Sequence, residues 1–301
     1  MSVDLPLQVV TWHEDDLADM TMAPRPGAVS RARPFIGEER GIAFRVSSTR
    51  MAGDRKTDFY TPRHRHTFDQ VRFYFGGVAK YGTKETYRAG DCLYIPGGTF
   101  YGPLSYENTP EDLRLFDLQY VGMSGRPYLG PEQVWHTHEL IKTKGHFEKG
   151  TFIWKDGKRQ DAFEVLVQEH LGHPVEYPVP GLNKYAAVRS AHLPWRNNSA
   201  LPGIEGKFLG HFTDVGPNVS MMRMAAGVRT PGGQKPYQQL RCLIEGSVRF
   251  VDDGERVFTP ASLQYVPAQA PYGEIECVDE ATLVLVKWAE DGQLYLPDPL
   301  A

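Results

Sequence analysis

The strongest constraint on the fold of this chain is an internal duplication. The string QVRFYFGG at residues 70–77 matches QLRCLIEG at 239–246, and YIPGGTFYG at 94–102 matches YVPAQAPYG at 265–273. In both halves the second string follows the first at nearly the same distance, so order, spacing and turn context all agree. Repetition of this kind indicates two copies of one structural unit. The fold must therefore be one that can be built twice.

Each half consists of short apolar runs separated by glycine and proline. The 301 residues include 30 glycines and 23 prolines, and turns are indicated at Gly76-Gly77, Ala89-Gly90-Asp91 and Pro96-Gly97-Gly98. Segments such as GIAFRVSSTRM and DLRLFDLQYVG alternate apolar and polar residues, as half-buried strands do. This rhythm predicts an all-β protein made of two barrels or sandwiches.

One helix is predicted between the two halves. Asp161 and Glu164 are spaced as a capping pair, and the apolar residues that follow share one helical face. Gly172 and Pro174 are typical of a helix end, so the helix should cover about residues 162–171.

The chain can be divided into three regions on this basis. Residues 1–125 form an N-terminal barrel, and their first 40 residues, rich in proline and without a helical period, form an extended arm. Residues 126–200 form a connecting segment with the short helix. Residues 201–301 form a C-terminal barrel.

Composition excludes several partners. The net charge is -4 with both signs interspersed, which argues against binding to nucleic acid phosphates. No run approaches the roughly 18 apolar residues of a membrane span, and the N-terminus does not resemble a secretory signal. Three cysteines without paired spacing do not form a disulfide framework, so a cytoplasmic location is expected.

His64 and His66 are the residues that most strongly indicate chemistry. Alternate residues of a strand point to the same face, so the two imidazoles should project side by side. Gln70 has the same parity if no bulge intervenes. Two imidazoles on one face provide half of a coordination sphere for iron, manganese, nickel or zinc.

These residues resemble the two motifs of the cupin superfamily. The first, His-x-His followed by Glu and Gly, is matched with Gln in place of Glu by His64, His66, Gln70 and Gly77. The second, which ends in His, is matched with Tyr in that place by Gly90, Pro96, Gly98 and Tyr101. Because both halves share the pattern, the chain resembles a bicupin. The resemblance implies a duplicated double-stranded β-helix, the jelly-roll barrel of cupins, with the short inter-domain helix between the copies.

The resemblance also implies a divalent metal ion in the N-terminal barrel. Its ligands would be His64, His66, Gln70 and Tyr101, with Fe(II) first and Mn, Ni, Cu or Zn as other choices. The implied reaction is an oxygen-dependent, dioxygenase-like oxidation or cleavage of a small organic substrate, which can be aromatic. Two alternatives stay open: a metal-dependent lyase or isomerase with Tyr101 as acid or base, and a bicupin that binds a small ligand without turnover.

Arg72 and nearby aromatic residues are the other candidates for the site. Arg72 has the parity of Gln70 and should point into the barrel, where it would act on a substrate anion or form an internal salt bridge. With Arg72, the expected substrate-binding residues are Phe68, Tyr74 and Phe100. Arg72 and Tyr101 are the expected catalytic residues.

The C-terminal copy acts as an internal control for these assignments. Gly233 and Lys235 stand where the first copy has His64 and His66, which predicts no metal site there. The copy nevertheless keeps the counterparts of Gln70, Arg72 and Tyr101, namely Gln239, Arg241 and Tyr272. These three residue types are therefore equally explained by hydrogen bonds inside each barrel. The apolar sheet faces of cupins are also compatible with a homodimer.

Overall fold

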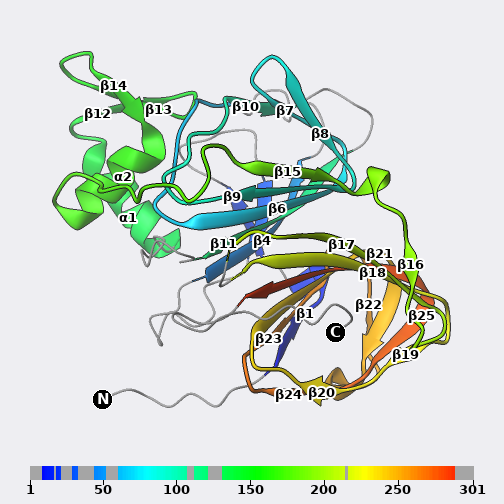
Figure 1. Cartoon of the computed structure of the whole chain (residues 1–301). Coiled ribbons are helices and arrows are strands. Elements are labelled where there is room, and N and C mark those ends of the chain that lie inside the picture. The colour runs from blue at the N-terminus through cyan, green and yellow to red at the C-terminus, as the bar shows by residue number, and fades with distance from the viewer. Residues whose placement is uncertain are drawn as a thin grey trace. The chain divides into compact units, whose positions relative to one another are not determined.

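The computed structural model describes residues 9–16, 18–21, 29–32, 44–51, 60–106, 112–120, 131–213 and 216–288. The chain divides into two compact units, Ala18–Ala187, here the first unit, and Met1–Leu17 with Val188–Ala301, here the second unit. Strands dominate both units, and the two α-helices of the described residues lie in the first (Figure 1). The expectation of an all-β fold built twice is confirmed.

The first unit contains a seven-stranded sheet in the order β15-β9-β6-β11-β4-β3-β2 and a four-stranded sheet in the order β5-β10-β7-β8. The strands of the larger sheet are β2 (Ala18–Thr21), β3 (Val29–Ala32), β4 (Phe44–Met51), β6 (Asp69–Gly76), β9 (Asp91–Ile95), β11 (Leu113–Tyr120) and β15 (Ala186–Arg189). Those of the smaller sheet are β5 (Tyr60–Thr61), β7 (Val78–Tyr81), β8 (Glu85–Arg88) and β10 (Leu104–Tyr106).

Strand β6 positions the interior polar residues of the first unit. It pairs with β9 on one side and β11 on the other, in a register that sets Gln70 opposite Gln119 and Arg72 opposite Asp117. Directly opposed residues share a face, so this part of the interior is polar. Two residues further along, Tyr74 opposite Leu115 begins the buried apolar cluster.

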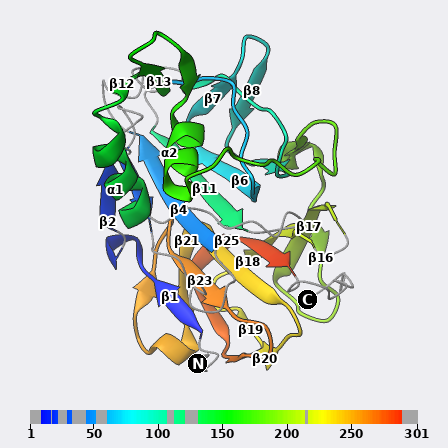
Figure 2. The same ribbon diagram turned by 90° about the vertical axis from the view of Figure 1, so that its left-hand side faces the viewer.

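The two helices lie together beside a small sheet of three strands in the first unit (Figure 2). They are α1 (Pro131–Ile141) and α2 (Ala162–Leu171), and the strands are β12 (Gly145–Glu148), β13 (Thr151–Trp154) and β14 (Arg159–Asp161). A separate apolar core, formed by Ile141, Phe152, Val165 and Leu166, holds this part together.

Helix α2 begins and ends as the sequence predicted. The Asp161 carboxylate accepts hydrogen bonds from the backbone N–H groups of Phe163 and Glu164, both at 3.0 Å, and Gly172 adopts a left-handed conformation at the C-cap. The expectation of a single helix was wrong, because the structure also contains helix α1. Its His, Thr, Val and Trp residues are poor helix formers, so Pro131 at its first position is a weak helix signal by itself.

The second unit is built on a nine-stranded sheet, whose main path is β1-β23-β21-β25-β18-β17-β16. Its strands are β1 (Val10–Trp12), β16 (Arg196–Asn197), β17 (Ile204–His211), β18 (Asn218–Met224), β19 (Arg229–Thr230), β21 (Gln238–Phe250), β22 (Val257–Phe258), β23 (Leu263–Val266) and β25 (Ile275–Trp288). The short strands β20 (Gly233–Gln234) and β24 (Pro271–Tyr272) form a separate pair.

The N-terminal segment differs from the expected extended arm. Strand β1 pairs with β23 and so belongs to the second unit, whereas β2 and β3 extend the large sheet of the first unit. The segment therefore contributes strands to both copies.

Equivalent backbone contacts in both units support the duplication. The Gly98 N–H donates to His66 O at 2.8 Å, and the Gln269 N–H donates to Lys235 O at 2.8 Å. The bridge between His64 and Tyr101 recurs as the pairing of Gly233 with Tyr272. These contacts confirm that the two histidines align with Gly233 and Lys235.

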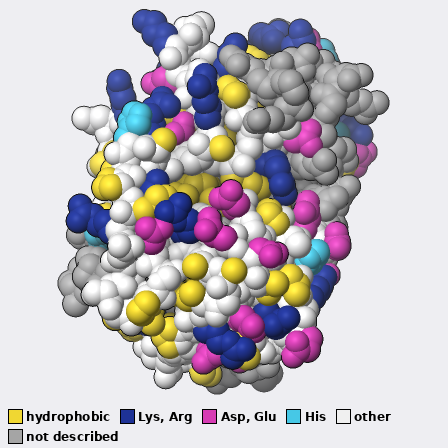
Figure 3. Space-filling view, turned by 90° about the vertical axis from the view of Figure 1, so that its right-hand side faces the viewer, with side chains coloured by type: hydrophobic (Ala, Val, Ile, Leu, Met, Phe, Trp, Pro, Cys, Tyr) yellow, Lys and Arg dark blue, Asp and Glu magenta, His cyan; other side chains and the backbone are white. Residues whose placement is uncertain are grey.

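The surface shows no large patch of a single charge on the face drawn in Figure 3, where acidic and basic side chains alternate. No helix in the described part of the chain is long and apolar enough to cross a membrane.

Candidate functional site

Two neighbouring segments of the first unit bring His64 and Tyr101 together. The His64 N–H donates to Tyr101 O at 3.0 Å, and the Tyr101 N–H donates to His64 O at 2.9 Å. His64 lies between β5 and β6 in this isolated bridge, not in a continuous strand as its alternation with His66 had suggested. The reciprocal bonds nevertheless fix both side chains at one end of the barrel interior.

The His64 imidazole is held in one tautomer. Its Nδ1 lies 2.7 Å from Pro62 O, and because a carbonyl can only accept, Nδ1 carries the proton of the neutral ring. Its Nε2 therefore accepts a hydrogen bond, and the Tyr101 hydroxyl donates it at 2.9 Å. Both side chains are almost fully buried, at 2% and 1% exposed.

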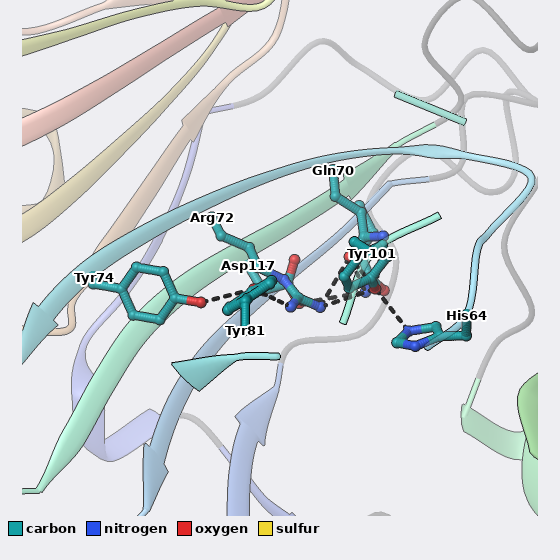
Figure 4. Close-up of polar contacts among 8 residues, drawn as sticks. His64, Gln70, Arg72, Tyr74, Tyr81, Tyr101 and Asp117 are labelled. Carbon is teal, nitrogen blue, oxygen red and sulfur yellow. Dashed lines mark hydrogen bonds and ion pairs between the residues drawn. The ribbon is translucent and has the colours of Figure 1, made fainter. Parts of the chain in front are cut away.

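The Tyr101 hydroxyl oxygen is the centre of a buried polar network (Figure 4). It accepts from Gln70 Nε2 at 3.1 Å and from Arg72 Nη2 at 3.3 Å, in addition to its bond to His64. Gln70 Oε1 in turn accepts from Arg72 Nη2 at 3.1 Å. One donated and two accepted bonds match the capacity of a hydroxyl group.

Arg72 links this centre to the far end of the network. Its Nη2 lies 3.3 Å from Asp117 Oδ2, and its Nη1 donates to the Tyr81 hydroxyl at 2.7 Å. Tyr81 and Tyr74 share a further hydrogen bond at 2.8 Å. An internal ion pair, one of the two readings open for Arg72, is therefore present.

The charges of the network are fixed by its surroundings. Burial opposes the charge of Arg72, but Asp117 and the neighbouring tyrosines raise its pKa well above the ordinary value, so it remains a cation. Burial raises the pKa of Tyr101 to about 12, although Arg72 acts in the opposite direction. Tyr101 is therefore a neutral phenol at physiological pH.

His66 lies beside this network, at the edge of the buried region. Its ring stacks on Phe68, with centroids 4.6 Å apart, and meets the His64 ring edge-on at 4.9 Å. The centroids of the His66 and Tyr101 rings are 5.9 Å apart. The two histidines are thus adjacent, as expected.

Phe100 lies apart from the other aromatic candidates. It is 45% exposed, and the guanidinium groups of Arg63 and Arg65 lie 4.8 and 4.7 Å from its ring centroid. Phe68 and Tyr74 are buried. The four expected substrate-binding residues therefore do not line one common wall.

Asp117, Tyr81 and Gln119 complete the network and were not among the residues predicted from the sequence. Gln119 Nε2 donates to Gln70 Oε1 at 3.4 Å. The alternating run LRLFDLQY carried a usable signal, because Asp117 and Gln119 have the parity of Leu115 and so face the core. Pairing them with β6, however, required the register.

The predicted four-ligand metal site does not fit this arrangement. The Tyr101 hydroxyl is a neutral donor to His64, and Gln70 Oε1 already accepts from a guanidinium group. Arg72 lies within 3.3 Å of both oxygens, so a divalent cation there would face a permanent positive charge. No group of three or more His, Cys, Asp or Glu side chains among the described residues could hold a metal ion.

The second unit repeats part of the network with different partners. Arg241 Nη1 donates to Gln264 Oε1 at 2.8 Å, and its guanidinium lies 4.3 Å from the Tyr272 ring centroid. In the register of β21 and β25, Arg241 is opposite Leu285, so leucine occupies the place of Asp117. Gln239 is opposite Lys287 in the same way.

Comparisons with known proteins support the fold. No family model and no curated protein sequence matches this chain. A putative dioxygenase from Nostoc punctiforme is similar in structure, with a TM-score of 0.58, 13% identity, and coverage of 98% of this chain and 89% of the other.

Oxalate decarboxylase from Bacillus subtilis superimposes with a TM-score of 0.53 and 13% identity, over 93% of this chain and 76% of that protein. Protein YlbA from E. coli superimposes with a TM-score of 0.53 and 9% identity, over 97% of this chain and 96% of that protein. The matches span both units, and the chain shares with these proteins a fold of two copies of one β-barrel unit.

Proposed function

We propose that the first unit contains the active site of a cupin enzyme that transfers protons to and from a small organic substrate. Tyr101 is the acid, and His64 is the residue to which its hydroxyl is hydrogen-bonded. The observation that carries the proposal is the buried Tyr101 hydroxyl, bonded to His64, Gln70 and Arg72. A general acid needs a proton at working pH and a way to stabilise its conjugate base. This network supplies both.

The proposal implies a proton path through the Tyr101 hydroxyl. Tyr101 would donate its proton to a substrate atom, and the phenolate formed would be stabilised by Arg72 and by the Gln70 amide. The same oxygen could then take a proton from a neighbouring substrate atom, which restores the phenol and isomerises the substrate. If the atom that receives the proton is a leaving group, its expulsion together with the transfer of a proton from the neighbouring carbon to the Tyr101 oxygen would give a lyase.

Arg72 has a positioning and electrostatic role in this proposal. Its guanidinium is engaged by Asp117 and Tyr81, which hold it against the Tyr101 oxygen. It stabilises negative charge on that oxygen and does not itself need to contact the substrate. His66 and Phe68, next to Tyr101, would form the wall that faces a planar substrate.

The proposal can be tested by solvent exchange. Keto acids, phenols and aromatic acids would be incubated with the protein in deuterated water, and loss of C–H signals followed by proton NMR. We expect exchange by the wild type and a loss of about 10²-fold or more in Tyr101→Phe. Tyr94→Phe is the matched control, since Tyr94 is also buried and bonded to a polar side chain, Asp69. Exchange unchanged in Tyr101→Phe would contradict the proposal.

A second candidate is the oxygen-dependent oxidation implied by the cupin resemblance. It is favoured by the tautomer of His64, because metal-bound histidines commonly donate their other N–H to a carbonyl, as His64 does to Pro62. A metal on His64 and His66 would require the Tyr101 hydroxyl to leave Nε2. Stoichiometric metal that disappears in His64→Ala and His66→Ala, together with oxygen uptake, would favour this candidate over proton transfer.

A further inference from the structure

The second unit contains a buried arginine without the acid that its counterpart has. Arg72 is opposite Asp117 in the first unit, whereas Arg241 is opposite Leu285 in the second. Arg241 is only 5% exposed. Among the described residues of the second unit, the buried polar side chains include no aspartate or glutamate. A buried cation without a counter-ion is costly, so this position favours an anion.

The known contacts of Arg241 are all to neutral groups. Gln264 accepts one hydrogen bond, and the guanidinium lies against the Tyr272 ring. Burial lowers the pKa of Arg241 to about 10, opposed by Tyr272, Tyr237 and, most weakly, the exposed Asp252. The group is therefore still charged at neutral pH. Lys287, which is 2% exposed, adds a second buried basic group in the next row of the same face.

Gln239 has an unused hydrogen-bond donor on the same face as Arg241. Gln239 precedes Arg241 by two residues in β21, so their side chains point to the same side. Gln239 is 4% exposed, and its Nε2 has no hydrogen-bond partner among the residues that the structure describes. In the first unit the equivalent Gln70 Nε2 donates to the Tyr101 hydroxyl. A buried amide N–H left without an acceptor costs free energy, which an anion would recover.

The second unit also lacks the side chain that fills this region in the first. Gly233 takes the place of His64 and pairs with Tyr272 as His64 pairs with Tyr101. A Cβ added at Gly233 would lie 3.2 Å from the Tyr272 hydroxyl. The imidazole of the first unit thus has no equivalent here, and the Tyr272 side chain itself lies against Gly233.

We propose that the second unit binds a small organic carboxylate between Arg241 and Gln239. The guanidinium lies against an aromatic ring, and its planar fork matches a carboxylate in two parallel hydrogen bonds. The absence of an acid at the position of Asp117 in this copy then has an explanation, because the ligand supplies the negative charge.

The test is direct binding to the full chain, measured by isothermal titration calorimetry with acetate and benzoate, and with phosphate as a separate arm. We expect saturable binding of a carboxylate at one site per chain. Arg241→Gln should weaken it by about tenfold or more, as the loss of a charge-assisted bond does. Arg223→Gln, which removes another arginine of the same unit paired with Glu205, should leave it unchanged.

A second variant guards against simple unfolding. Leu285→Asp restores the acid that the first unit has opposite its arginine, so it should abolish carboxylate binding while the circular dichroism spectrum is retained. Binding of neither acetate nor benzoate to the wild type, binding of phosphate alone, or carboxylate binding that survives both Arg241→Gln and Leu285→Asp would overturn the proposal. Because the readout is binding in the second unit, failure here would leave the proton-transfer proposal for Tyr101 untouched.

Discussion

At the scale of single residues, the ion pair of Arg72 and Asp117 determines the chemistry available to Tyr101. It keeps a cation within 3.3 Å of the phenol oxygen, and the Asp117 carboxylate lies 3.3 Å from the same guanidinium nitrogen, Nη2. The charge that would repel a metal ion is thus the charge that would stabilise a phenolate. The buried pair of Arg72 and Asp117 therefore favours proton transfer by Tyr101 over chemistry that needs a metal ion at this position.

Breaking this pair should be costly. Asp117→Leu would leave Arg72 buried without its counter-ion, and we expect a loss of about 3–5 kcal/mol in the free energy of unfolding. The double variant Arg72→Met with Asp117→Leu should recover most of that loss, because no uncompensated charge remains. Urea denaturation gives both values. A single variant as stable as the wild type would show that the pair does not hold the charge of Arg72.

Tyr101 should also affect stability at alkaline pH. Its pKa rises from 10 in the unfolded chain to about 12 in the folded protein, so between these values the unfolded state has lost a proton that the folded state keeps. The stabilisation is present below pH 10 and is lost as the pH rises through about 12. This difference in pKa corresponds to a change of about 3 kcal/mol in the free energy of unfolding.

Because other buried tyrosines behave alike, the measurement is a difference. The free energy of unfolding of the wild type should fall more steeply than that of Tyr101→Phe between pH 10 and 12. Parallel curves for the two proteins would mean that Tyr101 ionises at its ordinary pKa.

The sequence predicted the residues of the site better than their contacts. Its cupin spacing placed His64, His66, Gln70 and Tyr101 in one region, and the structure brings them together. It did not reveal that the tyrosine hydroxyl would bond to both His64 and Gln70. Nor did it reveal the ion pair of Arg72 with Asp117, because the register of β6 and β11 and not a local pattern sets these two residues opposite each other.

At the scale of elements, local signals were reliable where the side chain itself makes the contact. Helix α2 was predicted from Asp161 and Gly172, and both residues cap it in the structure. Helix α1 has weaker helix formers, and its stability comes from packing of Ile141 against Phe152 and Leu166. Tertiary contacts of this kind have no local signature.

The cap of α2 gives a prediction at this scale. Asp161→Ala removes the acceptor for two backbone N–H groups, and we expect a loss of about 1 kcal/mol in unfolding free energy. Asp161→Asn should retain most of the stability, since asparagine caps helices about as well as aspartate. Thermal denaturation of the three proteins compares them. Equal losses in both variants would assign the effect to the charge and not to the cap.

At the scale of the whole molecule, the two copies have diverged around a shared framework. Equivalent bonds at Gly98 and Gln269 show the framework, while the exchange of His64 for Gly233 and of Asp117 for Leu285 shows the divergence. The duplication could be predicted from the sequence because the same strand and turn motifs recur in the same order. The sequence could not show that β1 belongs to the second unit. A strand of three residues is too short to display a period, and Trp12 is 251 positions before its partner, Leu263.

The placement of β1 leads to a prediction with a built-in control. Strand β1 covers β23 through Val10 opposite Tyr265 and Trp12 opposite Leu263. Without residues 1–12, β23 would become an edge strand, and its outward N–H groups would exchange with solvent. Hydrogen exchange followed by mass spectrometry should therefore show faster exchange at 263–266. Strand β9, which occupies the equivalent place in the first unit, should keep its protection at 91–95. If amide exchange became equally faster at both strands, β1 would stabilise the entire chain and not only the second unit.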